Sequence, residues 1–297
     1  MSELRARSTA RRRPRSGRHV GEPAPAFGDS FRALGTLAYE GATVSAHVVD
    51  VTSGEELVAI DDRMSLPTAS LGTVLLLVEL SARLTVQGHG ALGILDKEPL
   101  ATGDSGLWQH LQAPALPVGD VATLIGAVGD GLATNLLLAR IGLDAVRARA
   151  ESLGLGRTAL LDVVRVVRGP DDAPQLSVGS TQELARLMAG LVRGEVVDPA
   201  TSERVTDWLS RGVDLSMVAS AFGLDPLARR GSDHGLSLVN KTGADRGVRS
   251  EAGVLRGPRA AVAYAVTVNF DDDGIARRLR VLEAMRTVGA DILEHVG

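Results

Sequence analysis

The chain has 297 residues, a formal net charge of −4 and no cysteine. Its length suits one large domain or two closely packed ones, and its 44% hydrophobic but only 3% aromatic residues predict an aliphatic core. The charge balance argues against a general nucleic-acid surface, and the lack of cysteine excludes disulfides, thiolate nucleophiles and cysteine metal sites. No apolar run approaches the ~20 residues that cross a bilayer, so we expect no membrane span.

Residues 1–26 carry seven arginines, three prolines and no apolar periodicity, and we interpret them as a disordered basic tail. No apolar stretch follows the arginines, so the tail does not resemble a secretory signal, and we expect a cytoplasmic protein. A weak contact of this tail with nucleic acid or membrane is an alternative to an inert solvated tail, which we favour.

The first part of the folded region predicts a helix, a hairpin and a long apolar helix. Residues 31–39 favour a short helix, and the alternating segments 44–51 and 57–60 flank a Thr-Ser-Gly turn typical of a β-hairpin. His47 is interpreted as a half-buried strand residue without a role. The apolar run over residues 70–84 is too long for a strand, so we expect a central helix with Ser70 in its first turn and a glycine stop at 87–90.

The middle of the chain predicts helices and loops, and its end predicts strands. Glycines and prolines break residues 91–120 and 156–180 into loops. Thr181 is a plausible N-cap for its helix. We expect helices at 121–128, 132–141, 144–153, 181–191, 199–210 and 275–296, and strands at 236–240, 252–255 and 260–269.

This order of elements predicts an α+β fold. Strands from both ends of the chain can join in one antiparallel sheet, which leaves the middle as a separate all-helical lobe. We therefore expect one domain over residues 27–297, with sheet parts at about 40–62 and 232–297 and the helical lobe at about 63–231.

Two residues stand out chemically. A serine at a buried helix N-terminus lies where unpaired N–H groups favour negative charge, which suits Ser70 as a nucleophile, although it can also be a simple N-cap. Lys241 is one of only two lysines, since the other 30 basic residues are arginine. A half-exposed strand lysine would also explain it.

Four stretches in order resemble the serine β-lactamase and penicillin-binding-protein superfamily, most of all the class A β-lactamases. They are SLPTASLGTVLLL, which contains Ser70, LIGAVGDGLATNLLLARIG around Asp130, STQELARLMAGL, and VNKTGADRGVRSEAGVL with Lys241, Thr242 and Gly243. The resemblance covers nearly everything after the tail. It implies an antiparallel sheet beside a helical lobe, Ser70 as the nucleophile of an S-x-x-K motif, and an intact K-T-G strand that receives a substrate carboxylate.

The chain departs from this pattern at several motif positions. Thr73 stands where the family has the lysine that accepts the serine's proton, and a threonine hydroxyl cannot do so near neutral pH. In the S-D-N motif, glycines at 129 and 131 replace the serine and the asparagine, while Asp130 is kept. Residues 156–175 contain no glutamate to activate a deacylating water, and Asp162 is the nearest carboxylate.

These departures predict a degenerate site, which binds small carboxylates or β-lactam-like ligands or is acylated only slowly. Within it Ser70, Lys241 and Asp130 are the candidate catalytic residues, and Thr242 and Gly243 the candidate ligand-binding residues. The alternative is an active serine hydrolase, a β-lactamase, amidase or esterase, that uses Ser70 with a rearranged base. Asp130 can instead cap the next helix, and Asn135 is interpreted as a structural amide. No metal cluster is visible, and we expect no cofactor.

Overall fold

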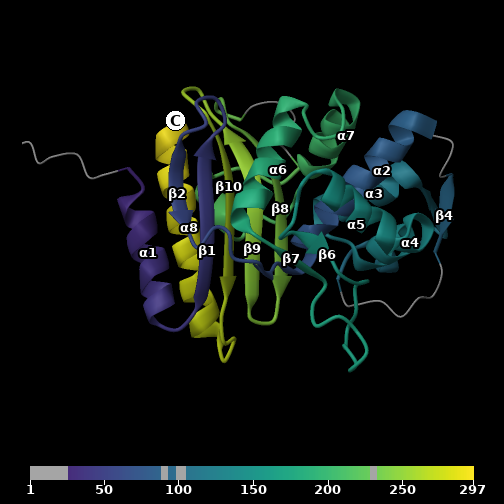
Figure 1. Ribbon diagram of the computed structural model, residues 1–297, viewed down its shortest axis with the longest axis horizontal. Coiled ribbons are helices and arrows are strands. Elements are labelled where there is room, and N and C mark those ends of the chain that lie inside the picture. The colour runs from purple at the N-terminus through teal and green to yellow at the C-terminus, as the bar shows by residue number, and fades with distance from the viewer. Residues whose placement is uncertain (1–25, 88–92, 98–104, 228–232) are drawn as a thin grey trace, which may run out of the picture.

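The computed structural model describes residues 26–87, 93–97, 105–227 and 233–297 of the chain. The predicted basic tail up to residue 25 and the predicted glycine stop after Gln87 lie outside the described residues. Figure 1 shows a sheet flanked by helices, next to a group of helices from the middle of the chain.

A five-stranded antiparallel sheet forms the centre, as the sequence predicts. Its spatial order β2-β1-β10-β9-β8 places the N-terminal hairpin beside the last strand, so both ends of the chain contribute to one sheet (Figure 1). The strands are β1 (Thr43–Asp50), β2 (Glu56–Ile60), β8 (Ser237–Asp245), β9 (Val248–Arg256) and β10 (Ala261–Asn269).

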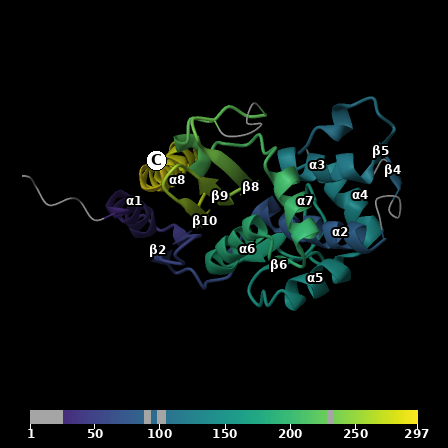
Figure 2. The same cartoon turned by 90° about the horizontal axis from the view of Figure 1, so that it is seen from above.

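Both faces of this sheet are buried, and each contributes to a separate core. In β10, Val262, Tyr264 and Val266 pack with α1 (Gly28–Tyr39) and α8 (Ile275–Val296), while Ala263 and Ala265 join the core of the helical lobe. This division follows from the period-2 alternation of side chains along a strand. Figure 2 shows α1 and α8 on one side of the sheet and α6 (Thr181–Arg193) on the other.

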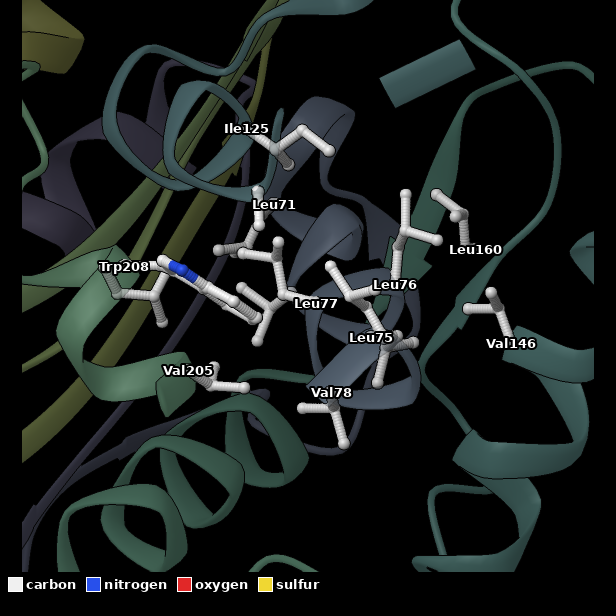
Figure 3. Packing of buried hydrophobic residues seen from close by; sticks show 14 of the residues in the cluster. Leu71, Leu75, Leu76, Leu77, Val78, Ile125, Val146, Leu160, Val205 and Trp208 are labelled. Atoms are coloured by element: carbon white, nitrogen blue, oxygen red, sulfur yellow. The ribbon is translucent and has the colours of Figure 1, made fainter. Parts of the chain in front are cut away.

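The helical lobe is built around α2 (Thr73–Gln87), which the 3₁₀ turn η1 (Ala69–Gly72) precedes. Leu75, Leu76 and Leu77 are fully buried and point toward different neighbours, which explains why this stretch is apolar on nearly every side (Figure 3). The surrounding helices are α3 (Val118–Val128), α4 (Gly131–Ile141), α5 (Leu143–Ser152) and α7 (Pro199–Leu209), with a 3₁₀ turn at Trp108–His110. A further 3₁₀ turn, Val218–Ala221, packs against α8 in the other core.

By length and composition alone, the stretch Ala69–Val86 could cross a membrane. From the sequence we predicted that no stretch of this kind exists, so that prediction is corrected. However, 78% of the stretch is buried inside the protein. This is the behaviour of the core helix of a folded domain.

Three further predictions need correction. The lobe is not all-helical, because it contains a small sheet of β3 (Leu66–Pro67), β7 (Ser177–Gly179) and β6 (Ala159–Leu160) and a pair β4 (Ile94–Asp96) and β5 (Ala115–Pro117). These strands are too short to show alternation in the sequence. The N-cap of α6 is Ser180, whose hydroxyl accepts from the Glu183 N–H, and not Thr181. His47 is buried rather than half-buried.

Candidate active site

Ser70 lies in the 3₁₀ turn directly before α2, at the junction of the helical lobe and the sheet. Its hydroxyl donates to the carbonyl of Thr242 on β8, with an Oγ–O distance of 3.3 Å. The N-cap position of the turn is Thr68, and no side chain caps it. The interpretation of Ser70 as a simple N-cap is therefore wrong, because its hydroxyl points across to the strand.

The turn that carries Ser70 is tightly held. Ala69 has φ of 50°, a left-handed conformation that costs a non-glycine residue free energy and persists only where its surroundings hold it. The buried Ser177 hydroxyl donates to the Ala69 carbonyl at 2.6 Å and accepts from the Gly72 N–H at 3.3 Å. A side chain at Gly72 would collide with Ser177, since a Cβ there would lie 2.3 Å from the Ser177 Cβ. Ser177 lies in no recognisable sequence motif and was not predicted.

Lys241 is the buried cation of the site. Its residue is only 4% exposed, so the interpretation as a half-exposed strand lysine is wrong. The Nζ donates to the Thr242 carbonyl at 2.6 Å, the same carbonyl that accepts from Ser70. Burial lowers the pKa of Lys241 from its ordinary value of 10.5 to about 8, although Asp214 and Glu251 favour the charged form. Among the residues that the structure describes, none forms an ion pair with this ammonium group.

Of the two residues after Lys241, one lines the pocket and the other packs behind it. Thr242 lines the pocket together with Ser70 and Lys241. Gly243 is not among the pocket-lining residues, and a Cβ there would lie 2.1 Å from the Thr68 carbonyl oxygen. The glycine is thus required for the close approach of β8 to the Ser70 turn.

At positions 73 and 129, which depart from the family pattern, no side chain is available to transfer the proton of Ser70. The Thr73 hydroxyl donates to the Ser70 carbonyl at 2.8 Å, so it is used within its own turn. Gly129 has φ of 64°, and a Cβ there would lie 3.4 Å from the Lys241 Nζ and 4.0 Å from the Ser70 Oγ. A side chain at position 129 would therefore contact both the serine and the lysine.

Asp130 is buried and holds backbone rather than facing the pocket. One carboxylate oxygen accepts from the Ala133 N–H, which caps α4, and the other accepts from the N–H groups of Leu107 and Trp108 at 2.6 and 2.7 Å. It is not among the residues that line the pocket. The interpretation of Asp130 as a helix cap is confirmed, and its hydrogen bonds give the side chain a structural role.

The irregular segment 156–175 is tied to α4 and to its own arginines. Asn135 donates to the Val164 carbonyl and accepts from the Val164 N–H, as predicted for a structural amide. Asp162 bonds Arg165 and Arg168. Burial raises the pKa of Asp162, but these hydrogen bonds outweigh it and hold the pKa below the usual value. Its oxygens are therefore engaged with arginines and do not resemble a base poised to activate water.

A pocket of about 490 Å³ joins these residues between the sheet and the helical lobe. Its wall includes Ser70, Lys241 and Thr242, together with the arginines Arg165 and Arg168. Three basic residues and two acidic ones, Asp214 and Asp245, thus line a volume that suits a small molecule.

A polar network beneath β8 was missed at the level of sequence. Glu251 is buried on β9 and accepts from the Tyr264 hydroxyl at 2.7 Å, from Asn240 at 2.9 Å and from the Ala219 N–H at 3.3 Å. Burial raises its pKa to about 7, although these hydrogen bonds act in the opposite direction. The available signal was a glutamate directly before the apolar residues 252–255 of the strand, since a buried glutamate is rare unless partners satisfy its carboxylate.

Comparison with known proteins identifies the family to which this fold belongs. The family model described as the beta-lactamase enzyme family matches residues 27–296. A comparison with curated protein sequences finds no match. Among solved structures, the β-lactamase from Sphaerobacter thermophilus DSM 20745 superposes with a TM-score of 0.77 at 20% identity, covering 91% of this chain and 97% of that one.

Two further structures show the same fold. PBP-A has a TM-score of 0.74 at 20% identity and covers 92% of this chain and 97% of its own. The class A β-lactamase from Mycobacterium abscessus has a TM-score of 0.71 at 18% identity and covers 87% and 97%. At these identities the likeness establishes the fold, an antiparallel sheet with a helical lobe, and leaves the chemistry to the residues of the pocket.

Proposed function

Because the chain belongs to the β-lactamase enzyme family, we propose that it is a β-lactamase-like protein with a degenerate active site. In this proposal the pocket binds small carboxylate ligands, including β-lactam-like ones, and Ser70 is acylated slowly or not at all.

The observation that carries this proposal is the buried Lys241 ammonium group beside Ser70. A buried cation is costly unless it is paired, and no ion-pair partner is present among the described residues. A ligand carboxylate in the pocket would supply a direct ion pair in addition to the attraction of Asp214 and Glu251, and Thr242 lines the same pocket. A charge-assisted hydrogen bond of this kind is about twice as strong as a neutral one.

Slow acylation follows from the groups around Ser70. General acid–base help contributes about 10²–10⁴-fold to such reactions. Thr73 cannot accept the serine proton, Gly129 offers no hydroxyl to relay it, and Asp162 is engaged with arginines. Both acylation and the following attack of water would lack their usual base.

A second function, a slow serine esterase, is favoured by the lowered pKa of Lys241. With a pKa of about 8, a minor fraction of Lys241 is a neutral amine at pH 7. That amine could accept the Ser70 hydroxyl proton while the Oγ bonds to an ester carbonyl carbon, and the ammonium could return the proton to the departing alkoxide. An activated ester needs less such help than an amide, so this activity would favour esters.

The test combines binding and covalent labelling on the full chain. Calorimetry with penicillins and cephalosporins measures binding, and intact-mass spectrometry after incubation with the same compounds and with activated esters detects an acyl group on Ser70. We expect binding that weakens with salt, at least tenfold weaker binding in Lys241→Met, and little or no hydrolysis of penicillins. Lys97→Met is the matched control, because Lys97 is the other lysine and, within the described segments, it bonds the backbone carbonyls of Gln109 and Leu111 and no side chain.

Different results separate the two functions and can reject both. Penicillin turnover near the ~10 per second typical of enzymes would reject the degenerate site. Ester hydrolysis that is lost in Ser70→Ala and rises as Lys241 loses its proton would establish the second function. Absence of both binding and labelling would leave the family relationship as a statement about fold alone.

A further inference from the structure

A histidine and two carboxylates converge at the sheet edge opposite to the serine pocket. They lie on β1, on β2 and just after β2, whereas Lys241 is on β8 at the other edge. The His47 Nδ1 is 2.9 Å from the Asp62 Oδ2 and 3.8 Å from the Glu56 Oε2. All three ligand atoms lie within 4.8 Å of one another.

These separations are close to those of a metal coordination shell. Zinc binds histidine nitrogen and carboxylate oxygen at about 2.0–2.2 Å, so neighbouring ligands of a tetrahedral site lie roughly 3.3 Å apart. The two distances from His47 lie on either side of this value. Small rotations of the Glu56 and Asp62 side chains would therefore place all three atoms around one ion.

The charge of this cluster is not balanced by arginine. Glu79, another carboxylate with little exposure, is held by Arg83 and Arg149, whereas Asp130 and Glu251 accept hydrogen bonds from N–H and O–H groups. In the described part of the chain, no arginine or lysine forms an ion pair with Glu56 or Asp62. Because the Asp62 side chain is only 15% exposed, its charge is poorly solvated, and a divalent cation would balance both carboxylates.

The surroundings also support a metal site. The Gln182 side chain of α6 donates to the Asp62 Oδ2 at 3.2 Å, and the Gln182 N–H donates to the Asp62 carbonyl at 3.0 Å. Such outer partners fix the orientation of ligating carboxylates. The side chain of His47 is 5% exposed and that of Glu56 is 54% exposed, so the site has a buried floor and an open side for water ligands.

We propose that His47, Glu56 and Asp62 bind one first-row divalent cation, for which Zn²⁺ is the representative. Imidazole and carboxylate together suit Zn²⁺ and its neighbours better than Mg²⁺. Bound there, the ion would link β1, β2 and the segment after β2, and so stabilise the hairpin at the point where Asp62 accepts from Gln182 of α6.

The experiment measures Zn²⁺ binding to the chelator-treated full chain by calorimetry, with Mg²⁺ as the comparison ion. We expect one Zn²⁺ per chain, a higher melting temperature with Zn²⁺ than with Mg²⁺, and at least tenfold weaker Zn²⁺ binding in His47→Gln and in Glu56→Gln. Glu55→Gln is the matched control, because Glu55 is the exposed neighbour of Glu56 and lies outside the cluster. Co²⁺ should give a visible absorption band that His47→Gln removes.

If His47→Gln fails to fold, Glu56→Gln still decides the test. Because the Glu56 side chain is half exposed, its replacement should not disturb the fold, and circular dichroism of the Glu56→Gln variant can verify this. Absence of Zn²⁺ binding overturns the proposal. So does Zn²⁺ binding that Glu56→Gln leaves unchanged, because the ion would then occupy other histidines of the chain.

Discussion

Replacing the buried Lys241 with methionine should separate stability from ligand binding. Methionine has a similar length and no charge, so Lys241→Met removes the ammonium group and keeps most of the packing. We expect the variant to lose carboxylate binding without losing stability at neutral pH, which is unusual for a buried residue.

The magnitude follows from the pKa of Lys241. Its fall from 10.5 to about 8 means that the folded protein resists the charged form, at about 1.4 kcal/mol per pH unit, or roughly 3 kcal/mol at pH 7. The variant also loses a charge-assisted hydrogen bond to the Thr242 carbonyl, worth about 1.5–3 kcal/mol. The net expectation is a free energy of unfolding at pH 7 between unchanged and about 2 kcal/mol higher.

The pH dependence gives a sharper readout. Between pH 8 and 10.5 the unfolded lysine keeps a proton that the folded one has lost, so the stability of the wild type rises with pH. Below pH 8 the cost of the buried charge is fully present, and above 10.5 it is gone. The stability advantage of Lys241→Met should therefore shrink by about 2–3 kcal/mol between pH 7 and pH 10.

Urea unfolding of the wild type and the variant at pH 7 and pH 10 measures this change. Lys97→Met, run in parallel, should show no such difference. If the two free energies of unfolding differ by the same amount at both pH values, Lys241 titrates normally and the proposed buried cation does not exist.

Three further predictions concern other residues of the site. Burial raises the pKa of Glu251 from 4.5 to about 7, so between these pH values the folded state holds a proton that the unfolded state has lost. The free energy of unfolding of the wild type should therefore fall by about 3 kcal/mol from pH 4.5 to pH 7, and Glu251→Gln should abolish this fall in urea unfolding. Asp130→Ala should lower the free energy of unfolding by about 3 kcal/mol or more, because three backbone N–H groups, including that of Trp108, lose their acceptor; an unchanged melting temperature would contradict this. Thr73→Lys should restore acylation more than turnover, so a β-lactam adduct should accumulate in intact-mass spectra and disappear when Ser70→Ala is added.

The sequence alone predicted most of the fold because its signals were local and strong. The apolar run over residues 70–84 was too long for a strand and therefore indicated a buried helix, and the hairpin with its Thr-Ser-Gly turn could be recognised without any neighbour. The structure and the family match confirm the antiparallel sheet built from both ends of the chain. The two-residue strands β3 and β6 were not predictable, because they exist only through pairing with β7.

The candidate site was predictable in residue identity but not in role. The resemblance to the β-lactamase motifs implied that Ser70, Lys241 and Thr242 share one site, and the pocket contains all three. Whether Asp130 faced a ligand or held backbone depended on the loop at Leu107 and Trp108, which lies 22 residues or more away in the sequence.

Charge and burial were decided only by the tertiary structure. The sequence determined that Lys241 is one of two lysines, yet only the packing of β8 against the Ser70 turn removes its ammonium group from water. Likewise, His47, Glu56 and Asp62 gave no metal-binding pattern in the sequence, and the hairpin and α6 bring them together. Desolvation and the proximity of charges depend on contacts between distant segments, and these determine what the same side chains can do.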